Sequence, residues 1–201
     1  MAASAVLAIA DLRGMDEAAF TPLLAWLGDD ERARCQRFQQ PQRRAQFIAG
    51  RALARILLGE LFHVAPASLR LRERAGQGPI LEGPFSAAGL SISHSGALVA
   101  VAASADSALG LDIELLDPGR DLPGLAEHAF GSAQAARLAT LPPAQQLRAF
   151  YRMWSEHEAR IKLGSEPACC IELPHDEVSV VLCAAAALAA PPVLRQVSLL
   201  A

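Results

Sequence analysis

The sequence predicts an α+β protein of two similar subdomains, residues 1–103 and 104–201. Two observations support this fold class. Each half contains one long segment with apolar side chains at helical spacing, and each half also contains short strand-like segments bounded by turns. These elements have similar sizes in the two halves, although no close sequence repeat is visible. We therefore expect each half to be a small antiparallel sheet packed with helices.

The first half is predicted to contain a strand, several helices and a loop. The predicted segments are a strand at residues 5–10, helices at 22–27, from Asp29 onward and from Pro41 to about Phe62, and a loop at 75–89. Thr21 and Pro22 supply an N-cap and a first-turn proline for the first helix. The long helix carries an apolar stripe formed by Phe47, Ala54, Leu57, Leu58 and Leu61. The loop is rich in Gly and Pro, which interrupt regular structure.

The second half continues from a predicted three-strand meander. The meander strands are residues 90–94, 98–103 and 108–115, and later strands are predicted at 178–183 and 193–200. Short helices are predicted near residues 125–130 and after Ser132. A long helix at 144–163 follows two prolines and ends at Gly164, a residue that commonly terminates helices.

The composition indicates a globular protein and excludes several functional classes. Hydrophobic residues make up 52% of the chain and charged residues 19%, which excludes disorder as the main state. A formal net charge of −3 argues against nucleic-acid binding. No segment is apolar over the length of a membrane span, and the N-terminus lacks the basic residues of a signal peptide. The cysteines lack CxxC spacing and predict reduced thiols in a cytoplasmic protein; they are Cys35, Cys169, Cys170 and Cys183.

Two carboxylates lie on one face of the strand predicted at residues 108–115. Because side chains alternate along a strand, Asp112 and Glu114 point to the same side, together with the small residues Ala108 and Gly110. Their mutual repulsion disfavours ionisation of both unless they face water or a cation. A solvated acidic face and a ligand site are both compatible with this pattern.

The second long helix carries a carboxylate at an unexpected place. Glu158 lies near the middle of the apolar stripe, flanked by His157 on one side and by Lys162, one turn further on, at the other. A buried charge normally has a partner or binds a metal. Glu158 and Lys162 could also form an ordinary helix-surface salt bridge. Lys162 is the single lysine among 18 basic residues, so its presence at this position requires an explanation of its own.

Three carboxylates from a strand and a helix are the type of ligand set that Mg²⁺ takes while it bridges substrate phosphates. The first long helix supplies cations at spacings that place them on one face, namely Arg44, Arg51 and Arg55. Taken alone, such a row is more often a solvated charged face. His94 follows Ser93 at a strand end, where the two side chains point to opposite faces. They therefore do not form a nucleophile and base pair, and His94 is either a turn-capping or hydrogen-bonded core histidine or a donor to a ligand phosphate.

Two segments resemble the signature motifs of one enzyme family. The segments are Leu109-Gly110-Leu111-Asp112-Ile113-Glu114 and Trp154-Ser155-Glu156-His157-Glu158-Ala159-Arg160-Ile161-Lys162. Together they resemble the 4′-phosphopantetheinyl transferases, and most closely the surfactin-synthetase-activator type, in which one chain has two pseudo-symmetric halves with the active site at their interface. The resemblance extends to Ser91-Ile92-Ser93-His94-Ser95-Gly96 and, more weakly, to residues 34–58.

The resemblance implies transfer of the phosphopantetheine arm of coenzyme A to a serine of an apo acyl or peptidyl carrier protein, with release of adenosine 3′,5′-bisphosphate. It implies Mg²⁺ as the cofactor and a monomer as a sufficient unit. The implied metal ligands are Asp112, Glu114 and Glu158. Glu158 or a water on the metal would be the base, and Lys162 would lie near the pyrophosphate. The implied coenzyme-binding residues are Arg51, Arg55, Ser93, His94 and His157.

Two positions depart from the family pattern. The family has Lys where this chain has His157, and it has Gly-Lys-Pro where this chain has Gln77-Gly78-Pro79, so that Arg72 or Arg74 would have to replace the missing lysine. These departures leave a second hypothesis open, namely a homologue that binds coenzyme A or a carrier protein without efficient turnover. A third hypothesis is an unrelated Mg²⁺ phosphohydrolase that uses the same three carboxylates.

Overall fold

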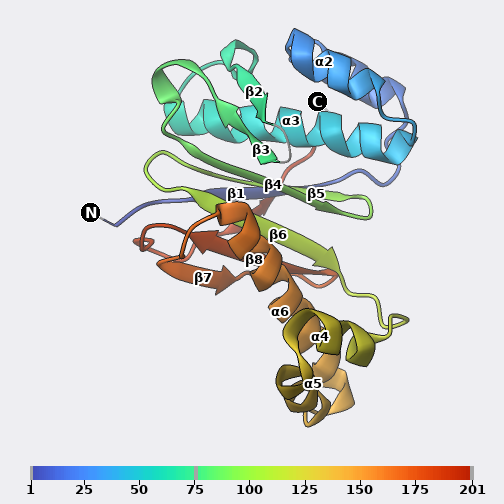
Figure 1. The fold of residues 1–201 in the computed structure, drawn as a ribbon. Coiled ribbons are helices and arrows are strands. Elements are labelled where there is room, and N and C mark those ends of the chain that lie inside the picture. The colour runs from blue at the N-terminus through green and yellow to red at the C-terminus, as the bar shows by residue number, and fades with distance from the viewer. Residues whose placement is uncertain (1, 75–76, 200–201) are drawn as a thin grey trace.

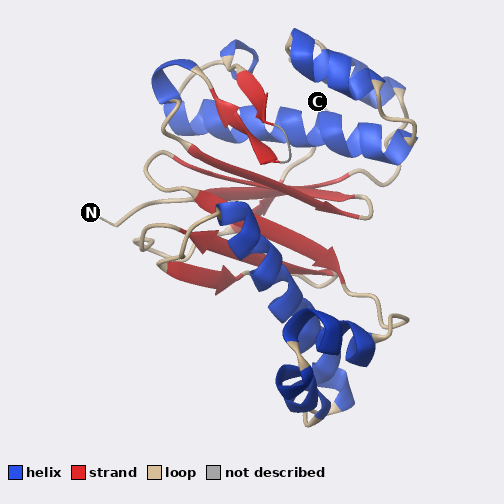
Figure 2. Cartoon of the chain, viewed as in Figure 1, coloured by secondary structure: helices blue, strands red, loops and turns tan. Residues whose placement is uncertain are grey.

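The computed structural model describes residues 2–74 and 77–199. The helices are α1 (Thr21–Leu24), α2 (Asp29–Gln36), α3 (Pro41–Phe62), α4 (Leu122–Phe130), α5 (Ser132–Ala139) and α6 (Pro143–Leu163). The strands are β1 (Val6–Asp11), β2 (Leu71–Arg74), β3 (Gln77–Leu81), β4 (Gly89–Ser95), β5 (Leu98–Ser104), β6 (Leu109–Leu115), β7 (Cys169–Glu172), β8 (Val178–Ala184) and β9 (Leu194–Gln196). The predicted α+β class is confirmed (Figure 2).

The elements form layers in the order α3, first sheet, second sheet, α6 (Figure 1). The first sheet has the strand order β4-β5-β1-β9, and the second has the order β6-β8-β7. The pairs within the second sheet are antiparallel, whereas β9 pairs with β1 in parallel. The hairpin of β2 and β3 lies beside α3.

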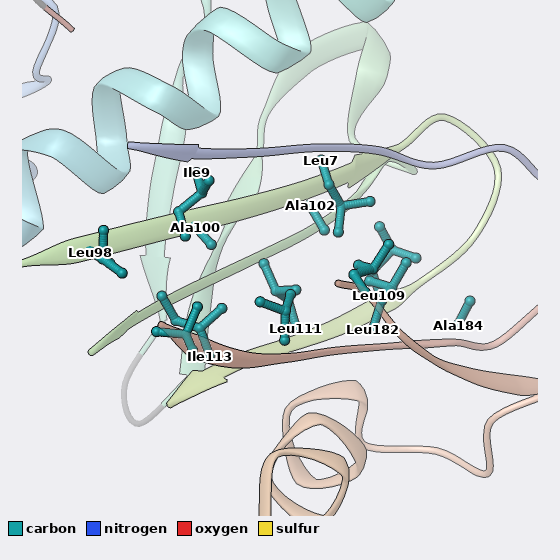
Figure 3. Packing of buried hydrophobic residues seen from close by; sticks show 13 residues of the cluster. Leu7, Ile9, Leu98, Ala100, Ala102, Leu109, Leu111, Ile113, Leu182 and Ala184 are labelled. Carbon is teal, nitrogen blue, oxygen red and sulfur yellow. The ribbon is translucent and has the colours of Figure 1, made fainter. Parts of the chain in front are cut away.

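The two sheets are joined by an apolar core between their facing sides (Figure 3). The first sheet contributes buried side chains that include Leu7, Ile9, Leu98, Ala100 and Ala102. The second contributes Leu109, Leu111, Ile113, Val178, Val180 and Leu182. The odd-numbered side chains of β6 thus fill this core. The even-numbered ones, which include Asp112 and Glu114, point to the other face of the second sheet, where α6 packs.

Both long helices begin and end at the residues that favour these positions. Each has a proline in its first turn, where a missing N–H costs no helical hydrogen bond. Gly164 ends α6 with a φ of 72°, a left-handed conformation in which its N–H reaches the carbonyl of Arg160. His63 takes the equivalent left-handed position at the end of α3, with a φ of 55°.

The predicted meander is wrong at its third strand. β4 and β5 form the expected hairpin, but β6 pairs with β8 and so belongs to the other sheet. The C-terminal strand β9 returns to the first sheet, which means that the first sheet includes residues from both predicted subdomains. Part of the predicted loop at 75–89 is the strand β3, while residues 75–76 of that loop and the end of the strand predicted at 193–200 lie outside the described residues.

The expectation that all cysteines are reduced is also corrected. Cys170 and Cys183 face each other in the register of β7 and β8, and they form a disulfide with a Cα–Cα distance of 4.1 Å. Cys35 and Cys169 are free thiols. No helix in the described part of the chain is long and apolar enough to cross a membrane.

Candidate active site

Serine hydroxyls connect the two sheets where β4 runs alongside β6. The outer edge of β6 presents backbone N–H groups that have no strand partner, and side-chain oxygens of β4 accept hydrogen bonds from them. The bonds run from the amides of Leu111, Ile113 and Leu115 to the hydroxyls of Ser91, Ser93 and Ser95, at 2.8, 3.2 and 3.0 Å respectively. This set of contacts, which we call the serine row, holds the carboxylate strand against the first sheet.

Asp112 is the centre of a buried polar cluster. It is 3% exposed, and its Oδ1 accepts hydrogen bonds from the hydroxyl of Ser93 at 3.0 Å and from Nζ of Lys162 at 2.7 Å. The same ammonium donates to Ser93 Oγ at 2.9 Å and to the carbonyl of Leu111 at 3.1 Å. Lys162 therefore bonds to Asp112, whereas the surface salt bridge with Glu158 considered from the sequence does not form among the ion pairs of the described residues.

A close approach of α6 to β6 brings Lys162 within reach of Asp112. A Cβ placed on Gly110 would lie 1.9 Å from the carbonyl oxygen of Ala159 and 2.7 Å from the amide nitrogen of Leu163. Only glycine fits this contact, because any side chain would push the helix away from the sheet. The Gly110 position in the motif therefore has a direct structural reason.

Glu114 lies next to Asp112 on the same face of β6. Its carboxylate accepts a hydrogen bond from the hydroxyl of Ser95 at 3.0 Å. Partial burial raises the pKa of Glu114, and the nearby charge of Asp112 raises it further, while the Ser95 hydrogen bond opposes both effects. A cation bound between the two carboxylates would remove this repulsion.

The residues present fit a divalent cation in part. Within the described residues, Oδ2 of Asp112 is a buried oxygen without a hydrogen-bond partner, and it is available as a metal ligand. Glu114 supplies a second carboxylate on the same face. Glu158 is half-buried on α6, but across residues 2–74 and 77–199 no three side chains of the metal-binding types lie together as a cluster. The structure thus brings together two of the three expected ligands.

Two buried hydroxyls that sequence reasoning missed belong to the surroundings of this site. Ser179 of β8 lies opposite Glu114 in the strand register, and Ser155 lies on the buried side of α6. Neither hydroxyl has a hydrogen-bond partner among the described residues. The position of Ser155 in the second motif was a sequence signal for a role here, whereas Ser179 could be found only from the register.

His94 and His157 lie in different environments. His94 is half-buried on β4, and a guanidinium nitrogen of Arg43 lies 2.9 Å from its Nε2 and 3.1 Å from its Nδ1. Burial lowers the pKa of His94, and the Arg43 charge lowers it further, so that both effects favour the neutral ring. His157 is exposed on α6, with its ring centroid 6.1 Å from that of Phe130.

Arg51 and Arg55, two of the predicted coenzyme-binding residues, pair with carboxylates of the first half. Arg55 has a fully buried side chain, and it forms an ion pair with Glu31 of α2. Arg51 is 7% exposed and pairs with both Glu31 and Glu73. Both guanidinium groups pair with carboxylates inside the first half. Arg55 is also fully buried, so its side chain is not accessible to a ligand in this structure. Arg51 and Arg55 are thus not part of a solvated face, whereas Arg44, the third member of the row, pairs with the exposed Glu17 at the surface.

The loop that departs from the family pattern has an arginine beside it. Nε of Arg74 donates a hydrogen bond to the carbonyl of Gly78 at 2.9 Å, whereas Arg72 pairs with Glu82 at the surface. Arg74 is therefore the better placed of the two to replace the missing lysine.

Comparison with known proteins supports the family resemblance seen in the sequence. Residues 15–106 match the family described as "4′-phosphopantetheinyl transferase, N-terminal". The 4′-phosphopantetheinyl transferase HetI of Nostoc is 34% identical over 158 residues, which cover 78% of this chain and 67% of HetI. The chain belongs to the 4′-phosphopantetheinyl transferase family. The signature segments predicted from the sequence thus mark a member of this transferase family.

Other relatives carry the same family name. The 4′-phosphopantetheinyl transferase AcpT of Escherichia coli K12 is 32% identical over 128 residues, covering 63% of this chain and 62% of AcpT. The 4′-phosphopantetheinyl transferase ffp of Bacillus subtilis is 28% identical over 158 residues, covering 79% of this chain and 67% of ffp. The matched part of this chain spans about two thirds or less of the length of these relatives.

Proposed function

We propose that this chain transfers the 4′-phosphopantetheine arm of coenzyme A to a serine hydroxyl of an apo carrier protein, with Mg²⁺ as cofactor and adenosine 3′,5′-bisphosphate as the second product. The observation that carries the proposal is the buried Asp112, held by Lys162 and Ser93 with one oxygen left free, in a chain of this family. We propose that the protein acts as a monomer and that it meets both substrates in the cytoplasm.

Asp112 and Glu114, with Glu158 as the third carboxylate, are the residues that would hold Mg²⁺. When bound, the cation would supply positive charge at the pyrophosphate of coenzyme A. Glu158 is half-buried on α6 and belongs to no cluster of three metal-binding side chains in the described part of the chain. The proposal assigns it the role of base for the serine hydroxyl of the carrier.

The reaction forms one P–O bond and breaks another. The serine oxygen bonds to the phosphorus that carries the pantetheine arm, and the bond from this phosphorus to the bridging oxygen of the pyrophosphate breaks. The serine proton passes to the base, and the leaving bisphosphate takes the electron pair. Lys162 is held beside Asp112 by three hydrogen bonds, and from there its positive charge would offset the negative charge that develops on the leaving oxygen.

The remaining coenzyme contacts are proposed for the β4 side of the site. His94 with Arg43 offers a cation and a ring nitrogen beside the carboxylates, which suits a phosphate group. Ser93 is already bonded to Asp112 and Lys162, so its role toward the coenzyme is to keep these two groups in place.

The test is an intact-mass assay with a panel of apo carrier proteins. The protein is incubated with coenzyme A and each carrier, with Mg²⁺ or with a chelator, and adenosine 3′,5′-bisphosphate is measured in parallel. The proposal predicts an added arm and equimolar bisphosphate in the Mg²⁺ samples. Calorimetric binding of coenzyme A without any product would instead support a binding homologue, and hydrolysis of coenzyme A without a carrier would support a phosphohydrolase.

A further inference from the structure

The three hydroxyls of the serine row differ in the group to which they donate a hydrogen bond. Each hydroxyl accepts an N–H from the edge of β6, which leaves one hydroxyl proton to donate. Ser95 donates this proton to Oε2 of Glu114 at 3.0 Å, and Ser93 donates to Asp112. Ser91 faces the Gly110 end of β6, where no carboxylate is present.

The accepted N–H fixes the direction of the donated proton. The hydroxyl of Ser95 lies 3.0 Å from the amide of Leu115, and this contact orients the oxygen relative to the backbone of β6. Glu114 has a longer side chain than Asp112, with one more rotatable bond, so it needs more help to stay in one orientation. In the described part of the chain, Ser95 is the residue whose side chain donates a hydrogen bond to Glu114.

We propose that Ser95 is a positioning residue, whose hydroxyl holds the Glu114 carboxylate in the orientation that binds the divalent cation. This inference rests on the proposed function, because it concerns the same two carboxylates. Removing a residue that hydrogen-bonds a metal-ligating carboxylate commonly weakens metal binding by about 10–100-fold. Without this residue the carboxylate is free to rotate, and part of the binding free energy is then used to fix its orientation.

The chain provides a matched control for this inference. Ser91 is buried and Ser95 is half-buried, and each accepts an N–H from β6, from Leu111 at 2.8 Å and from Leu115 at 3.0 Å; Ser91, however, hydrogen-bonds to no carboxylate within the described residues. Ser91→Ala and Ser95→Ala therefore each remove the hydrogen bond that a β6 amide donates to the serine row. Only the second also releases a carboxylate, so any difference between the two variants reports on Glu114. Ser93 is unsuitable for this comparison because Lys162 also bonds to it.

The experiment measures Mn²⁺ binding directly, by electron paramagnetic resonance, on the full chain with and without coenzyme A. Ser95→Ala is expected to raise the dissociation constant for Mn²⁺ about tenfold or more, whereas Ser91→Ala changes it less than about twofold. Ser95→Thr keeps the hydroxyl and is expected to bind within about threefold of the wild type. Circular dichroism and melting temperature confirm that all variants are folded, and the Mg²⁺ concentration for half-maximal transfer gives the kinetic counterpart.

Several outcomes would overturn the inference. They are equal Mn²⁺ affinities for Ser95→Ala and Ser91→Ala, a Ser95→Thr variant as weak as Ser95→Ala, and a wild type that binds no Mn²⁺ in either condition. Failure of the proposed function looks different. In that case the wild type adds no arm to any carrier, yet Ser95→Ala still binds Mn²⁺ more weakly than Ser91→Ala, and the positioning role stands.

Discussion

Glu31 is the carboxylate that balances the charge of the buried arginines of α3. Replacing it by a neutral residue should lower the free energy of unfolding. Its side chain is 1% exposed and binds Arg55, which is fully buried, through Oε1 at 3.1 Å and Oε2 at 2.5 Å. It also pairs with Arg51 at 3.2 Å and accepts the N–H of Gly28 at 2.8 Å. Glu31→Gln leaves a buried guanidinium without a counter-charge.

Breaking a buried ion pair by removing one partner costs about 3–5 kcal/mol. For a chain of this size, each kcal/mol lowers the melting temperature by about 2–4 °C, so the expected decrease is about 6–20 °C. Urea denaturation followed by circular dichroism measures the free energy of unfolding directly. The control is Glu82→Gln, because Glu82 pairs with Arg72 at the surface with side chains 49% and 54% exposed. It should lose less than about 1 kcal/mol. An equally small loss for Glu31→Gln would refute the structural role of this network.

Three further predictions concern the site and the disulfide. Lys162→Arg keeps the charge but replaces a compact ammonium that donates to three oxygens, so transfer should fall by about tenfold or more with an unchanged circular dichroism spectrum, and undiminished transfer would contradict this role. Burial and the charge of Arg43 lower the pKa of His94, so the folded state binds fewer protons than the unfolded chain, and wild-type stability should fall as pH drops below the unfolded value of 6.5. His94→Gln should flatten this dependence, and an equal slope in urea titrations between pH 5 and 8 would argue against it. Reduction of the Cys170–Cys183 disulfide should lower the free energy of unfolding by about 2–4 kcal/mol in urea with and without reductant, and finding four free thiols in the untreated protein would show that the bond does not form.

The helices and the carboxylate strand could be predicted because their signals are local. α3 and α6 are marked by a first-turn proline and an apolar stripe, and α6 also by Gly164. Strand alternation was sufficient to place Asp112 and Glu114 on one face, and the structure has them there. These features depend on neighbouring residues along the chain.

The remaining features depend on partners that are distant in the sequence. The turn between β5 and β6 favours a meander in which these two strands pair. In the structure β6 pairs instead with β8, which lies about 70 positions further along the chain. The burial of Arg55 follows from Glu31, 24 positions away, and a charged row without a known partner is indistinguishable from a solvated one. The disulfide requires the register of β7 and β8.

The serine row shows where a local signal was present but incomplete. Ser91, Ser93 and Ser95 occupy every second position of β4, and strand alternation places such side chains on one face. Their function as acceptors for the edge of β6 was not visible, because it requires two strands of different sheets to lie side by side.

The central claim is that the buried carboxylate of Asp112 serves arm transfer in this chain. The most direct measurement is the intact mass of an apo carrier after incubation with coenzyme A, Mg²⁺ and either the wild type or Asp112→Asn. The asparagine keeps an oxygen for Ser93 and Lys162 but removes the charge. Asp117→Asn is the control, because Asp117 is exposed and its side chain accepts the N–H of Gly119, while its contact with the Tyr151 hydroxyl is made by the backbone carbonyl. We predict an added arm with the wild type and with Asp117→Asn, and at least about 100-fold slower transfer with folded Asp112→Asn. Transfer by Asp112→Asn at the wild-type rate would contradict the account.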